Sequence, residues 1–253
     1  MAQVKPASEF GKDLLEQAGI QQIIGMFDLL PDLLFWIKDE HSRIVHCNKY
    51  YLAHIGASTL SQALGCDDYA FSAPHLARQF IVDDKQVMSG NEVHERLEMN
   101  TLRSGEIAWF TTSKRPLLNA QGSVIGSYGT SRHLDKLIAG AQGFNVLKQS
   151  TDYIRAHFAE NIALDTLASV SNLSISALER RYKKHMSKTP KQFLNEVRLE
   201  NARRLLVETH LSINQIASDS GFSDHSYFSR KFARLFGEQP SAFRKTHWLE
   251  TAK

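Results

Sequence analysis

IASDSGFSDHSYFSRKF, residues 216–232, is the stretch that decides the fold. Its apolar residues recur at helical spacing on both sides of Gly221, and a glycine tolerates the left-handed backbone with which one helix ends before another begins. Just upstream, Ser212 and Gln215 have the spacing of a capping box, which marks a helix start. Ser223 or Asp224 is expected to cap the helix after the turn. The stretch therefore predicts two short helices joined by a tight turn.

The same pattern occurs once more, 49 or 50 residues earlier. Asn172 stands where the second copy has Gly221, and asparagine is the next most tolerant residue for that conformation. Ser174 is expected to cap the helix that follows, although Ala163 stands where a cap is usual and Ser187 where a glycine is usual. Between the copies, Thr189 and Pro190 predict the start of a long helix. The matched pairs are Leu164/Ile213, Leu167/Ile216, Ala168/Ala217, Ser176/Ser226, Leu178/Phe228, Arg180/Arg230, Tyr182/Phe232, Pro190/Pro240 and Phe193/Phe243.

The second helix of each pair is expected to have one apolar and one basic face. A helix with one buried face and one short, basic, hydrogen-bonding face fits the major groove of DNA. The apolar positions are Leu178, Tyr182, Phe228 and Phe232. The basic positions are Arg180, Arg181, Lys183, Lys184, Arg230, Lys231 and Arg234.

Charge is distributed unevenly along the 253 residues, which are enough for two domains. Residues 145–253 hold 17 basic and 11 acidic side chains, a net charge of +6, whereas residues 1–144 have a net charge of −3. This difference favours a polyanion as the partner of the C-terminal part, although a chance imbalance would look the same. No stretch approaches the roughly 20 apolar residues of a membrane span, and no secretion signal opens the chain, so we expect a cytoplasmic protein with no membrane partner.

The N-terminal part is predicted to be mixed α/β. Residues 33–37 and 43–47 form a hairpin pattern around a polar turn, short helical patterns follow, and three more strands are predicted at residues 93–102, 107–114 and 124–130. Such an α+β layout buries one sheet face under helices.

Residues 153–245 resemble the DNA-binding domain of the AraC/XylS family of bacterial regulators. Residues 216–222 and 226–232 carry the resemblance most strongly, together with Gly237, Pro240 and Arg244. It implies an all-α domain with two helix-turn-helix units joined by a long helix. The DNA-binding residues that it implies, with two lysines of the basic faces, are Ser176, Glu179, Arg180, Lys184, His225, Ser226, Ser229, Arg230 and Lys231.

Several of these positions have alternative interpretations. Arginine bonds guanine bidentately and glutamate accepts from cytosine, but Arg180 and Arg230 would equally suit phosphate contacts. Glu179 would also suit an ion pair with Lys183 on the same helix.

Residues 27–134 resemble a PAS domain, through residues 33–39, 44–48, 109–114, 119–126 and 130–132. The resemblance implies a small ligand or cofactor between sheet and helices, and dimerisation. The candidate pocket residues, each of which would also serve as ordinary core, are Phe35, Tyr51, Ile55, Thr111 and Tyr128. The cofactor stays unknown: Cys66 lacks the flavin-photosensor motif, and haem would need an axial ligand such as His75 or His94. The expected domains are 1–19 tail, 20–133 PAS-like sensor, 134–150 connector, 151–248 DNA reader and 249–253 tail.

Together these patterns predict a sequence-specific transcription regulator, an activator, whose sensor domain controls the reader through the connector. Its expected partners are double-stranded promoter DNA, RNA polymerase, a second copy of the chain and a small-molecule ligand. The alternatives are a haem-based redox or gas sensor, a ligand-independent regulator that uses the PAS-like domain only for protein contacts, and an architectural DNA protein. An enzyme is not expected, because no metal-binding pair, nucleophile elbow or phosphate-binding loop occurs.

Overall fold

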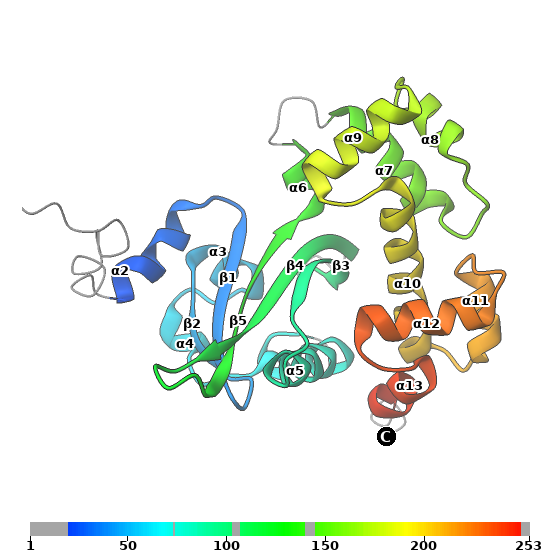
Figure 1. The fold of residues 1–253 in the computed structure, drawn as a ribbon. Coiled ribbons are helices and arrows are strands. Elements are labelled where there is room, and N and C mark those ends of the chain that lie inside the picture. Colours follow the sequence, from blue (N-terminus) through cyan, green and yellow to red (C-terminus); the bar gives the residue numbers. More distant parts are fainter. Residues whose placement is uncertain (1–19, 73, 103–106, 140–144, 249–253) are drawn as a thin grey trace, which may run out of the picture.

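The computed structural model describes residues 20–72, 74–102, 107–139 and 145–248. Its N-terminal part is built on an antiparallel sheet of order β2-β1-β5-β4-β3 (Figure 1). The strands are β1 (Leu33–Asp39), β2 (Ile44–Cys47), β3 (Val93–Thr101), β4 (Ile107–Leu118) and β5 (Val124–His133). The predicted strand pattern is confirmed, with β4 and β5 running a few residues further than expected.

Helices lie between β2 and β3 in the chain and cover one face of this sheet. They are α3 (Lys49–Ile55), α4 (Leu60–Ala63), η2 (Asp68–Ala70) and α5 (Pro74–Met88); α2 (Ile20–Gly25) and η1 (Met26–Leu29) precede β1. Leu34 and Trp36 pack with Tyr51 in the core under α3. Phe35, between them, points to the opposite face and stacks on Phe27, with ring centroids 3.8 Å apart. The predicted α+β domain is therefore present.

The C-terminal part is entirely helical where it is described. The first helix-turn-helix unit is α8 (Leu164–Val170) and α9 (Ile175–Met186), and the second unit is α11 (Ile213–Asp219) and α12 (His225–Phe236). The long helix α10 (Pro190–Glu208) runs between them (Figure 1). The remaining helices are α6 (Leu134–Ala139), α7 (Asn145–His157) and α13 (Pro240–Trp248). Helix α7 begins inside the range expected to be a connector, and residues 140–144 of that range lie outside the described residues.

Local sequence signals account for these helix ends. Ser174, Ser212 and Asp224 cap α9, α11 and α12, and Thr189 and Gln192 form a capping box at the start of α10. The turns inside the two units have positive φ at Asn172 (51°) and Gly221 (82°), as predicted. Ser187 takes the left-handed conformation that glycine would adopt more easily, and Ala163 gives α8 no side-chain cap.

Among the described residues the buried apolar side chains form three clusters, and one of them crosses between the two parts of the chain. Leu97, Met99 and Trp109 of the sheet pack in the same cluster as Leu147 and Ile154 of α7. The remaining members of this first-unit cluster include Leu167, Leu178, Tyr182, Phe193, Leu194 and Val197. The sensor-like domain and the first unit are therefore packed together, and the connector is not their only contact. No helix among the described residues is long and apolar enough to cross a membrane.

Candidate nucleic-acid interface

Helix α9 buries one face in the first unit and exposes the other. Leu178, Tyr182 and Met186, spaced four residues apart, are buried, and the Tyr182 hydroxyl lies 3.1 Å from Ser150 Oγ on α7. The predicted DNA-binding residues of this helix, Ser176, Glu179, Arg180 and Lys184, are all exposed. The apolar stripe thus fixes the helix with its polar row directed to solvent.

Helix α12 repeats this arrangement with larger side chains. Phe228, Phe232 and Phe236 are buried. They belong to a second hydrophobic cluster, here called the second-unit cluster, whose other members include Leu199, Leu206, Ile216, Phe222 and Phe243. The predicted residues His225, Ser226 and Arg230 are exposed, and Ser229 and Lys231 are half-buried. His225 is held toward the preceding helix, with Nε2 3.3 Å from Ser218 Oγ, and the Lys231 ammonium lies 5.3 Å from the centroid of the Tyr227 ring.

Each helix exposes a serine and an arginine one turn apart at equivalent positions of the repeat. Both arginines, Arg180 and Arg230, are exposed, and a guanidinium group at such a position suits either a base edge or a phosphate. Lys183 donates to the carbonyl oxygen of Ser187 at 3.3 Å. This contact directs Lys183 toward the helix end, which does not support the alternative in which it neutralises Glu179.

The side chain of Asp224 caps the first turn of α12. Asp224 accepts hydrogen bonds from the backbone N–H groups of Tyr227 and Ser226, and these bonds lower the pKa of Asp224. The carboxylate therefore caps the helix in its charged form and resolves the choice between Ser223 and Asp224.

The sensor-like domain contacts the reader through the edge strand β3. A free strand edge presents unpaired N–H groups, and here the N–H groups of Leu97 and Met99 donate to Glu196 (3.1 Å) and Glu200 (2.6 Å) of α10. Residues two apart on a strand and four apart on a helix have nearly equal spacing, so two carboxylates on one helix face match two adjacent N–H groups. Lys188 reinforces the contact by donating to Glu196 and to the carbonyl oxygen of Glu95. We call this contact the joint. Sequence reasoning missed it, because its partners are about 100 residues apart.

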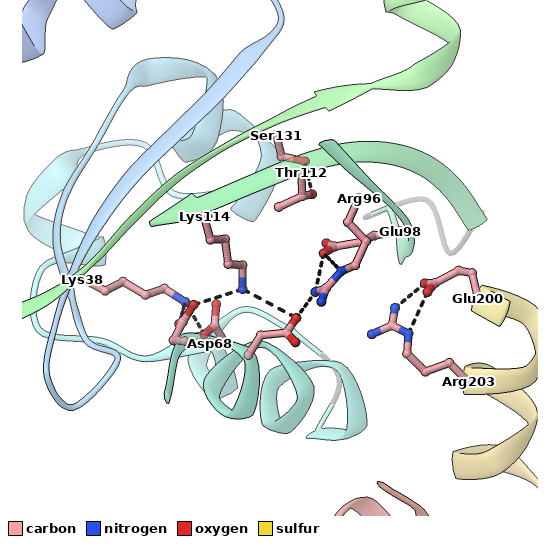
Figure 2. Close-up of polar contacts among 11 residues, drawn as sticks. Lys38, Asp68, Arg96, Glu98, Thr112, Lys114, Ser131, Glu200 and Arg203 are labelled. Carbon is pink, nitrogen blue, oxygen red and sulfur yellow. Dashed lines mark hydrogen bonds and ion pairs between the residues drawn. The ribbon is translucent and has the colours of Figure 1, made fainter. Parts of the chain in front are cut away.

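The joint extends to the C-terminal end of α12. Arg96 of β3 and Arg203 of α10 both lie over the ring of Phe236, 5.6 and 5.4 Å from its centroid. Figure 2 shows how Arg96 is held by Glu98, and Arg203 by Glu200. A cleft of about 650 Å³ lies beside the joint, between α5, the start of β3 and the end of α12. One domain thus contacts the end of a helix that is predicted to read DNA.

Buried ion pairs occupy the interior of the sensor-like domain. The Lys38 ammonium donates to Asp68 (2.5 Å), as Figure 2 shows, and also to Asp84 (2.8 Å). Lys114 donates to the other oxygen of Asp84 (3.0 Å). The cavity left beside them has a volume of only about 50 Å³. Small-molecule sites occupy roughly 300–1,000 Å³, so this cavity does not fit a haem.

Of the five predicted ligand residues, Tyr51 lines this cavity. Successive side chains of a strand point to opposite faces of the sheet. Leu34, Thr112 and Ser131 line the cavity, so the predicted residues Phe35, Thr111 and Tyr128 point to the other face. Ile55 packs at the edge of the core under α3. Of the two histidines considered for haem, His94 lines the cleft at the joint, and the side chain of His75 lies outside those the structure describes.

A second compartment adjoins the small cavity and is mostly apolar. Leu34 and His54 line both spaces, and the outer one has a volume of about 350 Å³. Burial lowers the pKa of His54 and of His133, so both are neutral near pH 7. His133 Nδ1 accepts from the N–H of Asp135 (3.2 Å), which leaves Nε2 as a hydrogen-bond donor. The remaining lining residues are Asp32, Tyr50, Ala53, Leu102, Phe110 and Lys136.

Both parts of the chain are similar to known protein families. A helix-turn-helix domain family matches residues 167–246, and a PAS fold family matches residues 27–137. The HTH-type transcriptional activator RhaS of Enterobacter sp. (strain 638) is 39% identical over 99 residues, which are 39% of this chain and 36% of that protein. RhaS of Escherichia fergusonii is 29% identical over 218 residues, 85% of this chain and 66% of that protein. The chain thus spans between about a third and two thirds of the length of these relatives.

Similar solved structures include a probable AraC family transcriptional regulator from Rhodopseudomonas palustris. It is 26% identical and covers 41% of this chain and 98% of its own, with a TM-score of 0.39. The DNA-binding domain of AdpA in complex with a target DNA is 27% identical, covering 40% of this chain and 91% of its own, with a TM-score of 0.39.

Proposed function

We propose that the chain acts as an AraC-type DNA-binding transcription regulator with a PAS domain, in which α9 and α12 read a bipartite DNA site in two successive major grooves. The observation that carries this proposal is the pair of equivalent exposed rows, Ser176/Arg180 and Ser226/Arg230, on two helices fixed at the ends of α10. Recognition helices on one rigid domain are expected to lie about 34 Å apart, one turn of DNA.

Roles follow from the side-chain chemistry. Arg180 and Arg230 bond guanine edges, Glu179 accepts from cytosine, and Ser176, Ser226, Ser229 and His225 accept or donate as the local base requires. Lys184 and Lys231 contact phosphates, which position the domain without reading sequence.

The protein is proposed to act as an activator, as the RhaS relatives are named, with RNA polymerase as its protein partner and the bacterial cytoplasm as its location. A second copy of the chain is the other proposed partner. The exposed side chains of α2, η1 and the residue after them support dimerisation, because large apolar groups in one segment favour a covered surface. They are Ile23, Met26, Leu29 and Leu30.

The PAS domain is proposed to sense a small, largely apolar molecule in the 350 Å³ compartment. Its volume lies within the range of small-molecule sites, and the neutral His133 offers one directional donor. The joint supports direct coupling to the reader, since ligand-induced repacking of the sheet would reach Glu196, Glu200 and Phe236 through β3. If no ligand binds, the domain would serve protein contacts only.

Selection of binding sites from random DNA by the full chain tests the two-unit reading. We expect two conserved blocks whose centres lie about 10 base pairs apart. Arg180→Ala is expected to erase sequence preference within one block and Arg230→Ala within the other. A single conserved block would contradict the two-unit reading, and the absence of any block would favour an architectural DNA protein instead.

A further inference from the structure

The two helix-turn-helix units have separate hydrophobic cores that meet on α10. Val197 belongs to the first-unit cluster, and Leu199 belongs to the second-unit cluster. The residue between them is Arg198, whose side chain is half-buried. In the middle of α10, the polar side chain of Arg198 therefore lies between the apolar cores of the two units.

Arg198 connects parts of the chain that belong to different units. Its Nε donates to the carbonyl oxygen of Phe158 (2.7 Å), and its Nη2 donates to that of Glu160 (2.7 Å), both in the segment that joins α7 to the first unit. The same guanidinium lies 5.9 Å from the centroid of the Phe222 ring, in the turn of the second unit. A planar group with several fixed donors holds two acceptors in one geometry, which a single point charge would not.

Gly221 brings the turn of the second unit against the same point. A Cβ atom at this position would lie 2.8 Å from the carbonyl oxygen of Phe158 and 2.9 Å from Arg198 Nε, and φ is +82°. The backbone of the second unit thus approaches the end of α7 more closely than any other residue type would allow. A rotation of one unit relative to the other would disturb both this approach and the hydrogen bonds of Arg198.

We propose that Arg198 is a positioning residue that fixes the separation of the two recognition helices and thereby the half-site spacing that the protein accepts. Changing the spacing by one base pair moves a half-site by about 3.4 Å and turns it by about 35° around the DNA axis. To contact a half-site moved in this way, the second unit would have to twist about the middle of α10. There Arg198 donates hydrogen bonds to the first unit and lies over the ring of Phe222 in the second unit.

The inference rests on the proposed two-unit reading, and binding to three DNAs tests both. The DNAs carry the selected site with its own spacing, one base pair fewer and one base pair more. Wild type is expected to lose about tenfold in affinity for each respaced DNA, a factor equal to about 1.4 kcal/mol. Arg198→Ala is expected to reduce this penalty to about twofold. The control Arg204→Ala removes a cation of the same helix that pairs with Glu208, and it should keep the full penalty.

Each contrary result has a distinct meaning. If Arg198→Ala weakens binding to all three DNAs by one factor and keeps the tenfold penalty, Arg198 affects stability alone and the inference fails. If wild type binds the three DNAs equally, the separation of the recognition helices is not fixed and the inference fails, whereas a single conserved block in the selected site is the result against the two-unit reading.

A distance measurement without DNA tests the mechanism directly. Spin labels at the equivalent positions Lys184→Cys and Arg234→Cys, in a Cys66→Ser background, report the separation of the recognition helices. We expect a narrow distance distribution that broadens in Arg198→Ala but not in Arg204→Ala, at temperatures where circular dichroism shows all variants folded. An unchanged distribution in Arg198→Ala would overturn the inference.

Discussion

At the scale of single residues, the charges in the protein serve two purposes. On α9 and α12, Arg180, Lys184 and Arg230 are exposed and are proposed to contact DNA. Inside the PAS domain, Lys38, Asp84 and Lys114 are buried and satisfy one another. Burial raises the pKa of Asp84, but Lys114 and Lys38 lower it by more, so the net shift is downward. A buried pair of this kind costs much to break, because the remaining charge loses its partner without regaining water.

Asp84→Asn is therefore expected to destabilise the protein by about 3–5 kcal/mol, since it leaves two buried ammonium groups with one carboxylate fewer. Urea unfolding followed by circular dichroism measures the change. The matched control is Glu92→Gln, which removes an exposed ion pair with Arg115 and should cost about 0–1 kcal/mol. Equal effects of the two substitutions would contradict the role assigned to the buried pairs.

The same carboxylates predict the acid side of the stability profile. The pKa values of Asp83 and Asp84 lie below the unfolded value of about 3.9, so their stabilisation is present above that pH and is lost as pH falls through the folded values. The raised pKa of Asp68 acts in the opposite direction. We expect the unfolding free energy to fall steeply below about pH 4 in wild type and less steeply in Asp84→Asn; parallel profiles would be inconsistent with this assignment.

DNA affinity separates base readers from phosphate contacts. Arg230→Ala is expected to cost about 1–3 kcal/mol on the selected site and much less on scrambled DNA, because a base contact carries sequence information. Lys184→Ala should weaken both DNAs alike and reduce the salt slope by about one unit. Titrations at several salt concentrations distinguish these outcomes, and equal losses of Arg230→Ala on both DNAs would remove its proposed role.

At the scale of elements, helix ends were predictable and strand faces were not. The caps at Ser174, Thr189 and Ser212 and the positive φ of Gly221 follow from local chemistry that depends on a few neighbouring residues. The run LLFWI over residues 33–37 is apolar at every position, so it predicts a strand but not which side chains face the helices. The pocket prediction consequently included Phe35, whereas Leu34 lines the cavity.

The capping box of α10 gives a direct test at this scale. Thr189→Ala removes the acceptor for the N–H of Gln192 and is expected to cost about 1 kcal/mol of unfolding free energy. Lys191→Ala, at an exposed position in the same turn, should change stability by less than about 0.5 kcal/mol. Thermal unfolding measures the stability of both variants. Indistinguishable melting temperatures would show that the capping box does not contribute to stability.

At the scale of the whole molecule, the joint makes the PAS domain and the reader one packed unit. Its hydrogen bonds connect residues about 100 positions apart, and neither periodicity nor capping signals report such pairs. The fold class of each part was predictable from the sequence because each part has its own local pattern. Their mutual placement depends on matching an edge strand to one face of α10, which only the folded structure displays.

Hydrogen exchange tests the joint. In Glu196→Ala/Glu200→Ala the amides of Leu97 and Met99 lose their acceptors and are expected to exchange faster, whereas amides of the central strand β5 stay protected. Glu208→Ala, near the other end of α10, is the control. Unchanged protection at both positions would show that the joint does not hold in solution.

In the proposed complex, both recognition helices of one chain contact DNA at once. Hydroxyl-radical footprinting of the full chain on its selected site measures this most directly. We expect two protected segments on one face of the DNA, with centres one helical turn apart, and loss of one segment in Arg230→Ala. A single short protected segment per chain would contradict it.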